Sequence, residues 1–249
     1  MGDKLKWNKT FLHCLYEMNS HRPNQHRHKK ALLICLAMIS GAVMANLRNP
    51  DVITNMPQDK RTADYIFSDP MIEIMLRHGI AKDRKLGLLP QCDSPYGVEP
   101  DSVDFIDPID FRKGSTHPVK GTWSIRYRLS RCGESKNYNT VFVATGDATA
   151  PAAHSYFPGS TNAGTQLIRD TMPAALAAAR ARSGQHDCKV VDVFDMIVSE
   201  PAHQVIDEGK TIEGVWAEKW TFQLCGQLSD VLLRFTPDAS NGGTLVKIE

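Results

Sequence analysis

Apolar and polar residues alternate along two stretches of the chain that lie 93 residues apart. The first copy runs from Gly121 to Gly133 and the second from Gly214 to Gly226, and residues 120–131 are the expected strand of the first copy. Both carry the pattern G-x-W-x3-aromatic-x4-C-G. A period of two places every second side chain on the same face, which predicts an antiparallel strand with one buried face. A polar turn and a second apolar alternation follow each stretch, so each copy predicts a β-hairpin.

The two copies place aromatic residues at matching positions. Trp123 corresponds to Trp216, and Tyr127 corresponds to Trp220. Aromatic side chains spaced in this way usually belong to a core, so we expect these residues to pack inside the protein. The alternative is a groove for carbohydrate or peptide, which uses the same residue types.

Helical spacing occurs in two other places. The first begins at Ser68-Asp69-Pro70, which suits a helix N-terminus, and Gly79 is expected to end it. The second begins near Ser160-Thr161 and runs to Gly184. Pro173 is expected to kink or divide this helix, because proline lacks the backbone N–H. Residues 80–102 lose periodicity and predict a long loop.

A nearly continuous apolar run over residues 190–198 predicts a central strand that is covered on both faces and ends at Pro201. Together these elements predict an α+β fold. We expect an antiparallel sheet, built from two similar β-hairpins that form an internal repeat, packed against a kinked helix. The expected organisation is a leader over residues 1–45, a loop-rich segment with one short helix over 46–118, and the α+β domain over 119–249.

The leader has the architecture of a secretory signal peptide. Residues 21–30 are basic, residues 31–40 are apolar, and small residues precede an expected cleavage site after Ala45. Met18 is the expected translation start. An uncleaved anchor is the alternative, although the apolar run is shorter than the roughly 20 residues that a membrane span needs. We expect contact with a membrane only through the leader before cleavage.

The formal net charge of the whole chain is +1, and its basic excess lies in the leader. The remainder carries more acidic than basic residues, so nucleic acid is not an expected partner. An acidic run between Glu99 and Asp110 could hold calcium, but its spacing does not match a calcium loop. A solvated loop or short strand edge is the favoured interpretation of this run.

Two of the six cysteines, Cys14 and Cys35, lie in the leader. Export would place the other four in an oxidising compartment. They predict two disulfides, with three connectivities left open by the sequence. Structural zinc is the competing interpretation, but no C-x2-C pair is present, and we expect neither a metal nor another cofactor. The four cysteines are Cys92, Cys132, Cys188 and Cys225.

Chemistry-bearing residues gather in two places. The loop of residues 147–161 offers Asp147, His154 and Ser155 near a helix N-terminus. Asp195 and His203 form a second group near the predicted central strand. These five residues are the candidates for catalysis, although no motif of a known catalytic class is present. The favoured interpretation of the loop is a capped connection carrying an exposed histidine. For Asp195 it is a structural pair with an arginine, or a strand-edge aspartate in water.

These observations favour an exported protein, periplasmic or secreted, that binds a partner or supports structure without catalysing a reaction. The expected partner is an envelope protein or a small ligand. A periplasmic hydrolase that uses the 147–161 loop is the first alternative. The second is a small-ligand carrier with a pocket between helix and sheet.

Overall fold

The computed structural model describes residues 57–88, 92–207, 209–238 and 242–249. The predicted leader, with its start at Met18 and its cleavage site after Ala45, lies outside these residues. Within them the chain forms three helices and eight strands. In chain order the elements are α3 (Lys60–Ile66), α4 (Asp69–Lys85), β1 (Gly97–Asp110), β2 (Lys120–Arg131), β3 (Glu134–Val143), β4 (Ala152–Ser155), α5 (Thr165–Ser183), β5 (Val191–Asp207), β6 (Lys210–Leu224), β7 (Gln227–Asp238) and β8 (Gly243–Ile248).

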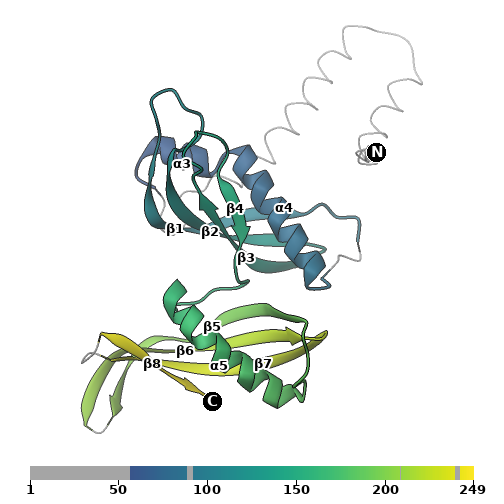
Figure 1. The fold of residues 1–249 in the computed structure, drawn as a ribbon, viewed down its shortest axis with the longest axis vertical. Coiled ribbons are helices and arrows are strands. Elements are labelled where there is room, and N and C mark those ends of the chain that lie inside the picture. Colours follow the sequence, from purple (N-terminus) through teal and green to yellow (C-terminus); the bar gives the residue numbers. More distant parts are fainter. Residues whose placement is uncertain (1–56, 89–91, 208, 239–241) are drawn as a thin grey trace, which may run out of the picture. The chain divides into compact units, whose positions relative to one another are not determined.

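The fold is α+β with antiparallel strands, as predicted, but the strands form two sheets and not one. β1 to β4 follow one another in the first sheet, and β5 to β8 do so in the second. α4 packs on the buried face of the first sheet, and α5 lies across the second (Figure 1). We call residues 60–155 the first module and residues 165–248 the second. The expected single sheet was wrong because each hairpin recruits two further strands of its own.

β1 corrects the expectation that residues 46–118 are loop-rich with one short helix. The described part of this segment holds two helices and a strand that pairs with β2. Arg126 of β2 lies 2.6 Å from Asp101, and Arg128 lies 2.5 Å from Glu99. Cross-strand charge pairs therefore stabilise the acidic run as a strand. The run alone gave no sign of these partners.

The aromatic residues of the two hairpins are buried, as predicted. Trp123 and Trp220 have no exposed surface, and Trp216 is 8% exposed. Trp123 stacks on Phe142 with ring centroids 5.5 Å apart. Trp216 stacks on Phe235 at 4.7 Å. These tryptophans belong to the two cores and do not line a groove.

Both long helices differ from their predicted limits. α4 continues through Gly79, where a Cβ atom would come within 3.1 Å of Leu129 and 3.3 Å of Tyr127. This glycine therefore lets the helix approach the sheet closely and does not end it. α5 begins at Thr165, later than expected, and Pro173 lies inside it without dividing it. Its last residue precedes Gly184, as predicted.

β5 is an edge strand and not the covered central strand that its apolar run predicted. It pairs only with β6, and Ile197 is 42% exposed. The strand also continues past Pro201, where the pairing shifts register between Glu200 and His203. Proline is tolerated at sheet edges and bulges because no ladder hydrogen bond is lost there. The prediction that Pro201 ends the strand was therefore wrong.

The cysteines pair as Cys92–Cys132 and Cys188–Cys225, each with a Cα–Cα distance of 5.9 Å. The structure thus selects one of the three possible connectivities. Each disulfide joins the segment after a long helix to the turn of the following hairpin. Cys132 and Cys225 both have φ 49°, and each is followed by glycine. Two successive left-handed residues are what a tight type I′ hairpin turn requires.

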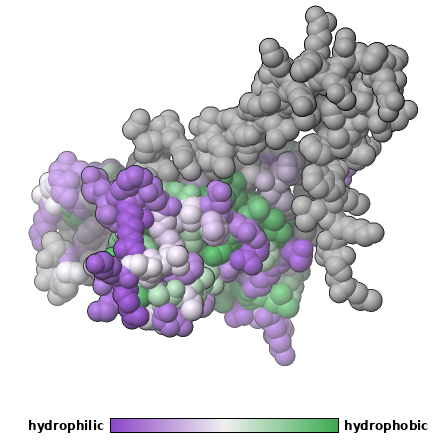
Figure 2. Space-filling view, turned by 90° about the horizontal axis from the view of Figure 1, so that it is seen from above, coloured by the Kyte–Doolittle hydropathy of each residue, from purple (hydrophilic) through white to green (hydrophobic). Residues whose placement is uncertain are grey.

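Some large apolar side chains lie on the surface. Ile206 is 78% exposed and Leu245 of β8 is 64% exposed. Figure 2 shows one face, on which hydrophilic side chains surround smaller apolar patches. Isolated exposed apolar residues are ordinary, so only those that adjoin a groove or a free strand edge bear on function.

Residues 156–160 link the modules and pair with strands on both sides. The N–H groups of Tyr156 and Gly159 donate to carbonyls of β3 at 2.9 Å each. The N–H of Ser160 donates to the Met196 carbonyl of β5 at 2.8 Å. Gly159 has φ +92°, and a Cβ atom there would overlap the backbone oxygen of Met196. Only glycine both adopts this positive φ readily and leaves room for the backbone of β5.

Replacing Gly159 by alanine is predicted to destabilise the protein by more than about 3 kcal/mol, because conformational strain adds to the overlap with β5. Urea-induced unfolding measures this loss. Gly184→Ala is the matched control, since Gly184 has φ +69° with no atom within 4 Å of the added Cβ. The control is expected to lose about 1 to 2 kcal/mol. Equal losses in the two variants would contradict the packing explanation.

Candidate functional site

The loop of residues 147–161 does not join its three candidate side chains into one site. Asp147 lies in an exposed turn and accepts hydrogen bonds from the hydroxyls of Thr145 and Thr149 at 2.6 and 2.7 Å. These bonds lower the pKa of Asp147 to about 2. His154 and Ser155 are neighbours on β4, so their side chains point to opposite faces of the sheet. The sequence did not predict this short strand.

Ser155 contacts a histidine from another element. The Nδ1 atom of His78 on α4 lies 2.9 Å from the Oγ atom of Ser155, across 77 residues of sequence. Burial, followed by the charges of Arg77 and His154, lowers the pKa of His78. A neutral imidazole can accept a hydroxyl proton, so this pair has the chemistry of a nucleophile and its base. Within the described residues no carboxylate orients the other ring nitrogen.

The second predicted group is spread along β5. The Oδ2 atom of Asp195 lies 3.1 Å from the Nζ atom of Lys136, and both side chains are largely buried. Asp195 is thus in an ion pair, but its partner is a lysine where an arginine was expected. The Nδ1 atom of His203 lies 3.0 Å from the carbonyl oxygen of Pro201, and its side chain is exposed. Asp195 and His203 are therefore in separate local environments.

Glu218 of β6 is a buried carboxylate that the prediction missed. The indole N–H groups of Trp216 and Trp220 donate to it at 2.8 and 2.7 Å. The hydroxyl of Thr161 and the backbone N–H groups of residues 162 and 163 supply the remaining donors. The segment that enters α5 is thereby bonded to the sheet. A carboxylate whose oxygens are satisfied by fixed donors serves as an anchor.

Strand alternation could have identified this anchor. Trp216, Glu218 and Trp220 share one face of β6, and a carboxylate among buried aromatic rings requires donors. The first module has Ile125 at the matching position. There the indole nitrogen of Trp123 is buried without a hydrogen-bond partner. The acceptor is thus specific to the second module.

The first module has its own buried carboxylate, Asp83 of α4. The hydroxyl of Tyr138 donates to it, and the Nε atom of Arg131 lies 3.1 Å from it. The Nε–H of Arg131 donates to the Leu88 carbonyl oxygen instead, so Arg131 and Asp83 interact through their charges and not through this N–H. Burial raises the pKa of Asp83 in spite of these partners, and it also raises the pKa of Tyr138. This cluster ties the end of α4 to the hairpin.

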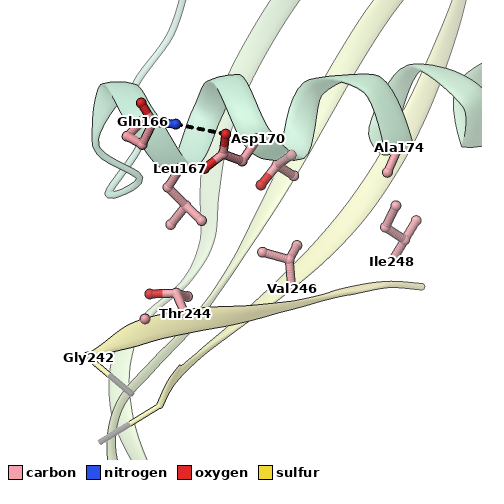
Figure 3. A pocket seen from close by; sticks show the side chains of 10 residues that line it. Gln166, Leu167, Asp170, Ala174, Gly242, Thr244, Val246 and Ile248 are labelled. Atoms are coloured by element: carbon pink, nitrogen blue, oxygen red, sulfur yellow. Dashed lines mark hydrogen bonds between the residues drawn. The ribbon is translucent and has the colours of Figure 1, made fainter.

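Three grooves lie beside the helices. One of about 580 Å³ separates α5 from β8, and Figure 3 shows side chains of the helix and the strand pointing into it. Another of about 430 Å³ adjoins α3 and α4, where Tyr65 Oη lies 3.0 Å from His117 Nδ1. Burial raises the pKa of Tyr65 to about 12. The third, of about 540 Å³, lies beside α5 and the linker.

The described residues hold no group of three or more His, Cys, Asp or Glu side chains arranged to bind a metal ion. None of their helices combines the length and apolar character needed to cross a bilayer. Comparisons with protein-family models, curated proteins and solved structures gave no match.

Replacing Glu218 by glutamine is predicted to cost about 2 to 4 kcal/mol of stability, because the buried donors lose a charged acceptor and face an NH₂ group. Urea unfolding followed by tryptophan fluorescence measures the change. Glu200→Gln is the control, since Glu200 lies 3.5 Å from Arg234 at the surface and should contribute less than about 1 kcal/mol. A Glu218→Gln loss no larger than that of the control would contradict the anchoring role.

His78 is predicted to titrate below the ordinary value of 6.5, because burial and nearby positive charge disfavour imidazolium. The unfolded chain then binds the proton at a higher pH than the folded chain. Stability should therefore be greatest above about pH 6.5 and fall as the pH drops through 6.5 towards the lower folded pKa. NMR titration of the ring measures this pKa, and His78→Gln should reduce the stability loss between pH 7 and 5. A ring pKa at or above 6.5 would refute the prediction.

Proposed function

We propose that this chain is an exported protein built from two copies of one disulfide-closed module, and that it works by binding a partner protein rather than by catalysis. The proposal is carried by one observation: the candidate catalytic side chains make separate local contacts and do not form one site. Asp147 closes a local turn, Asp195 pairs with a lysine, and Ser155 contacts a helix residue. In the described structure none of the five candidates forms a side-chain hydrogen bond to another.

The matching geometry of the two modules supports the proposal that they are copies of one unit. The disulfides occupy corresponding turns, and the stacked Trp–Phe pairs lie at corresponding places in the two cores. The buried positions of the two helices also match. Met75 and Gly79 of α4 lie 17 and 13 residues before Cys92, and Thr171 and Ala175 of α5 lie 17 and 13 residues before Cys188. A shared origin by duplication accounts for these agreements in both strand and helix.

Export is supported by the disulfides together with the leader. Disulfides persist mainly in oxidising compartments, and this chain has one in each module. The basic and apolar segments over residues 21–45 have the order of a signal peptide. Together they favour a periplasmic or secreted location.

The test is recovery of the protein from its native host, followed by N-terminal sequencing and disulfide mapping without reduction. The expected chain begins at Asn46 and contains the pairs Cys92–Cys132 and Cys188–Cys225. Cytosolic protein with an intact leader, in which Cys92, Cys132, Cys188 and Cys225 are all reduced, would refute export. In-host photo-cross-linking should join the exported chain to another protein, and recovery of the chain without cross-linked protein would refute the binding role.

The contact between His78 and Ser155 favours a second candidate, a hydrolase. Ser155 would be the nucleophile and His78 the base that receives its proton. Hydrolysis of activated esters of graded acyl length by the wild-type protein and by Ser155→Ala separates the two functions. Under the proposed binding function the two proteins react at the same slow rate. Hydrolysis that depends on Ser155 would establish the hydrolase instead.

A further inference from the structure

The space between the long helix and the last strand differs in the two modules. In the first module Met75 is fully buried at the helix, and a hydrogen bond between His78 and Ser155 joins the helix to the last strand. Counting back from the first cysteine of each module, the matching residues in the second are Thr171 and Ala174. These smaller side chains line the groove of about 580 Å³ between α5 and β8.

The strand side of the groove also differs. Ser155 pairs with Thr140 in the first module, and Ile248 occupies the matching place opposite Leu233 in the second. In Figure 3, Val246 and Ile248 point towards α5, while Leu167 and Ala174 point towards β8. An apolar strand residue facing alanine cannot form the bridge that the first module has. The groove therefore remains open between mainly apolar walls.

Thr171 contributes a polar group that nothing in the structure satisfies. Its side chain is 5% exposed and lines the groove, and its hydroxyl is buried without a hydrogen-bond partner. An unsatisfied buried hydroxyl is costly and unusual in a folded protein. A threonine on a helix can bond to a carbonyl of the preceding turn, but this one does not. A group bound in the groove would supply the partner that this hydroxyl lacks.

β8 supplies backbone groups along the same groove. It is the last strand of its sheet, so one of its edges is unpaired among the residues that the structure describes. The N–H of Glu249 donates to the Leu232 carbonyl, which places the odd-numbered residues of β8 in the ladder with β7. Thr244, Val246 and Ile248 therefore turn their N–H and C=O groups to the free edge. Donors and acceptors that alternate at two-residue intervals are complementary to another extended backbone.

The rim adds a charge. Asp170 lines the groove and accepts a hydrogen bond from Gln166 at 2.8 Å, and it belongs to none of the ion pairs within the described residues. On the other face of β8, Leu245 is 64% exposed. A strand added beside β8 would lie about 4.8 Å away, which brings its side chains within reach of both faces.

From these features we infer that the groove between α5 and β8 binds an extended segment of a partner polypeptide. The segment adds to the free edge of β8 as a further strand and inserts an apolar side chain between α5 and β8. A polar group of the segment bonds to the Thr171 hydroxyl, and a basic side chain lies near Asp170. Addition of a strand to a sheet edge gives affinity through the backbone and specificity through alternate side chains. This inference rests on the proposed binding function and assigns that function a site.

The experiment uses the oxidised mature chain and a phage-displayed library of random nonapeptides. Selected peptides are synthesised, and their dissociation constants are measured for the wild type and for variants. Thr171→Met restores the residue type of the first module and fills the groove, while Val246→Pro removes one outward N–H at an edge position that tolerates proline. Each is expected to weaken peptide binding at least tenfold. Asp170→Asn is expected to weaken it several-fold and to remove the preference for basic peptides.

Ala153→Pro is the matched control, because Ala153 holds the place of Val246 on the last strand of the first module. It should leave peptide affinity within twofold of the wild type. Hydrogen exchange on the unmodified protein provides a second measurement that needs no variant. The amides of Val246 and Ile248 should gain protection when the selected peptide is added.

Three results would overturn the inference. They are a selection that enriches no peptide, selected peptides that bind Thr171→Met and Val246→Pro as well as wild type, and a dimer that Val246→Pro dissociates. The last result would assign the edge to a second copy of this chain. The proposed site and the proposed binding function can be refuted independently. If a partner still cross-links to both Thr171→Met and Val246→Pro, this site is refuted and the binding function stands.

Discussion

The burial of Glu218 is the constraint on which the second module depends. Its carboxylate lies under α5 and satisfies donors from two sources, the indoles of β6 and the segment entering the helix. Without it those donors would be buried and unpaired, which is costly in a low-dielectric interior. The same bonds set where α5 starts, and with it the position of the helix face above β8. Gly159 acts just before this point, where the linker passes against β5. Helix, linker and sheet are therefore located by one short stretch of chain.

The two modules share their apolar framework and differ in their polar contacts. Each has a helix on a four-stranded meander, a stacked Trp–Phe pair and a disulfide at the hairpin turn. The buried carboxylate, however, comes from the helix in the first module, as Asp83, and from a strand in the second, as Glu218. The fold therefore requires the alternation of apolar side chains and tolerates change in the polar groups between them. Such change is what separates a closed helix–strand contact from an open groove.

The local pattern of apolar and polar residues was sufficient to predict some elements of the fold and not others. The strand over residues 120–131 was predicted with its correct limits, and Trp123 and Tyr127 were predicted to face the core, because alternation is a local signal. β1 was missed because its local pattern is irregular, and the contacts that hold it as a strand, the ladder with β2 and the burial of Val98 and Val103, come from distant parts of the chain. The path of β5 was misjudged because an apolar run does not distinguish an edge strand from a central one. At the candidate site, Ser155 was named as a possible nucleophile, but His78, the histidine that contacts it, is distant in sequence and was not named. Contacts of this kind become visible only after the helix has packed.

The pairing of the cysteines has a consequence for the order in which the chain matures. Cys92 and Cys132 are 40 residues apart, Cys188 and Cys225 are 37 apart, and each pair is complete before the next begins. A chain that emerges with its N-terminus first therefore presents both thiols of the first pair before any thiol of the second. Among these four cysteines, each pair can therefore be oxidised before the first thiol of the next pair has emerged. A nested or crossed arrangement would have required a first thiol to wait, or an isomerase to exchange a wrong bond. Consecutive pairing makes correct oxidation the default outcome of vectorial synthesis.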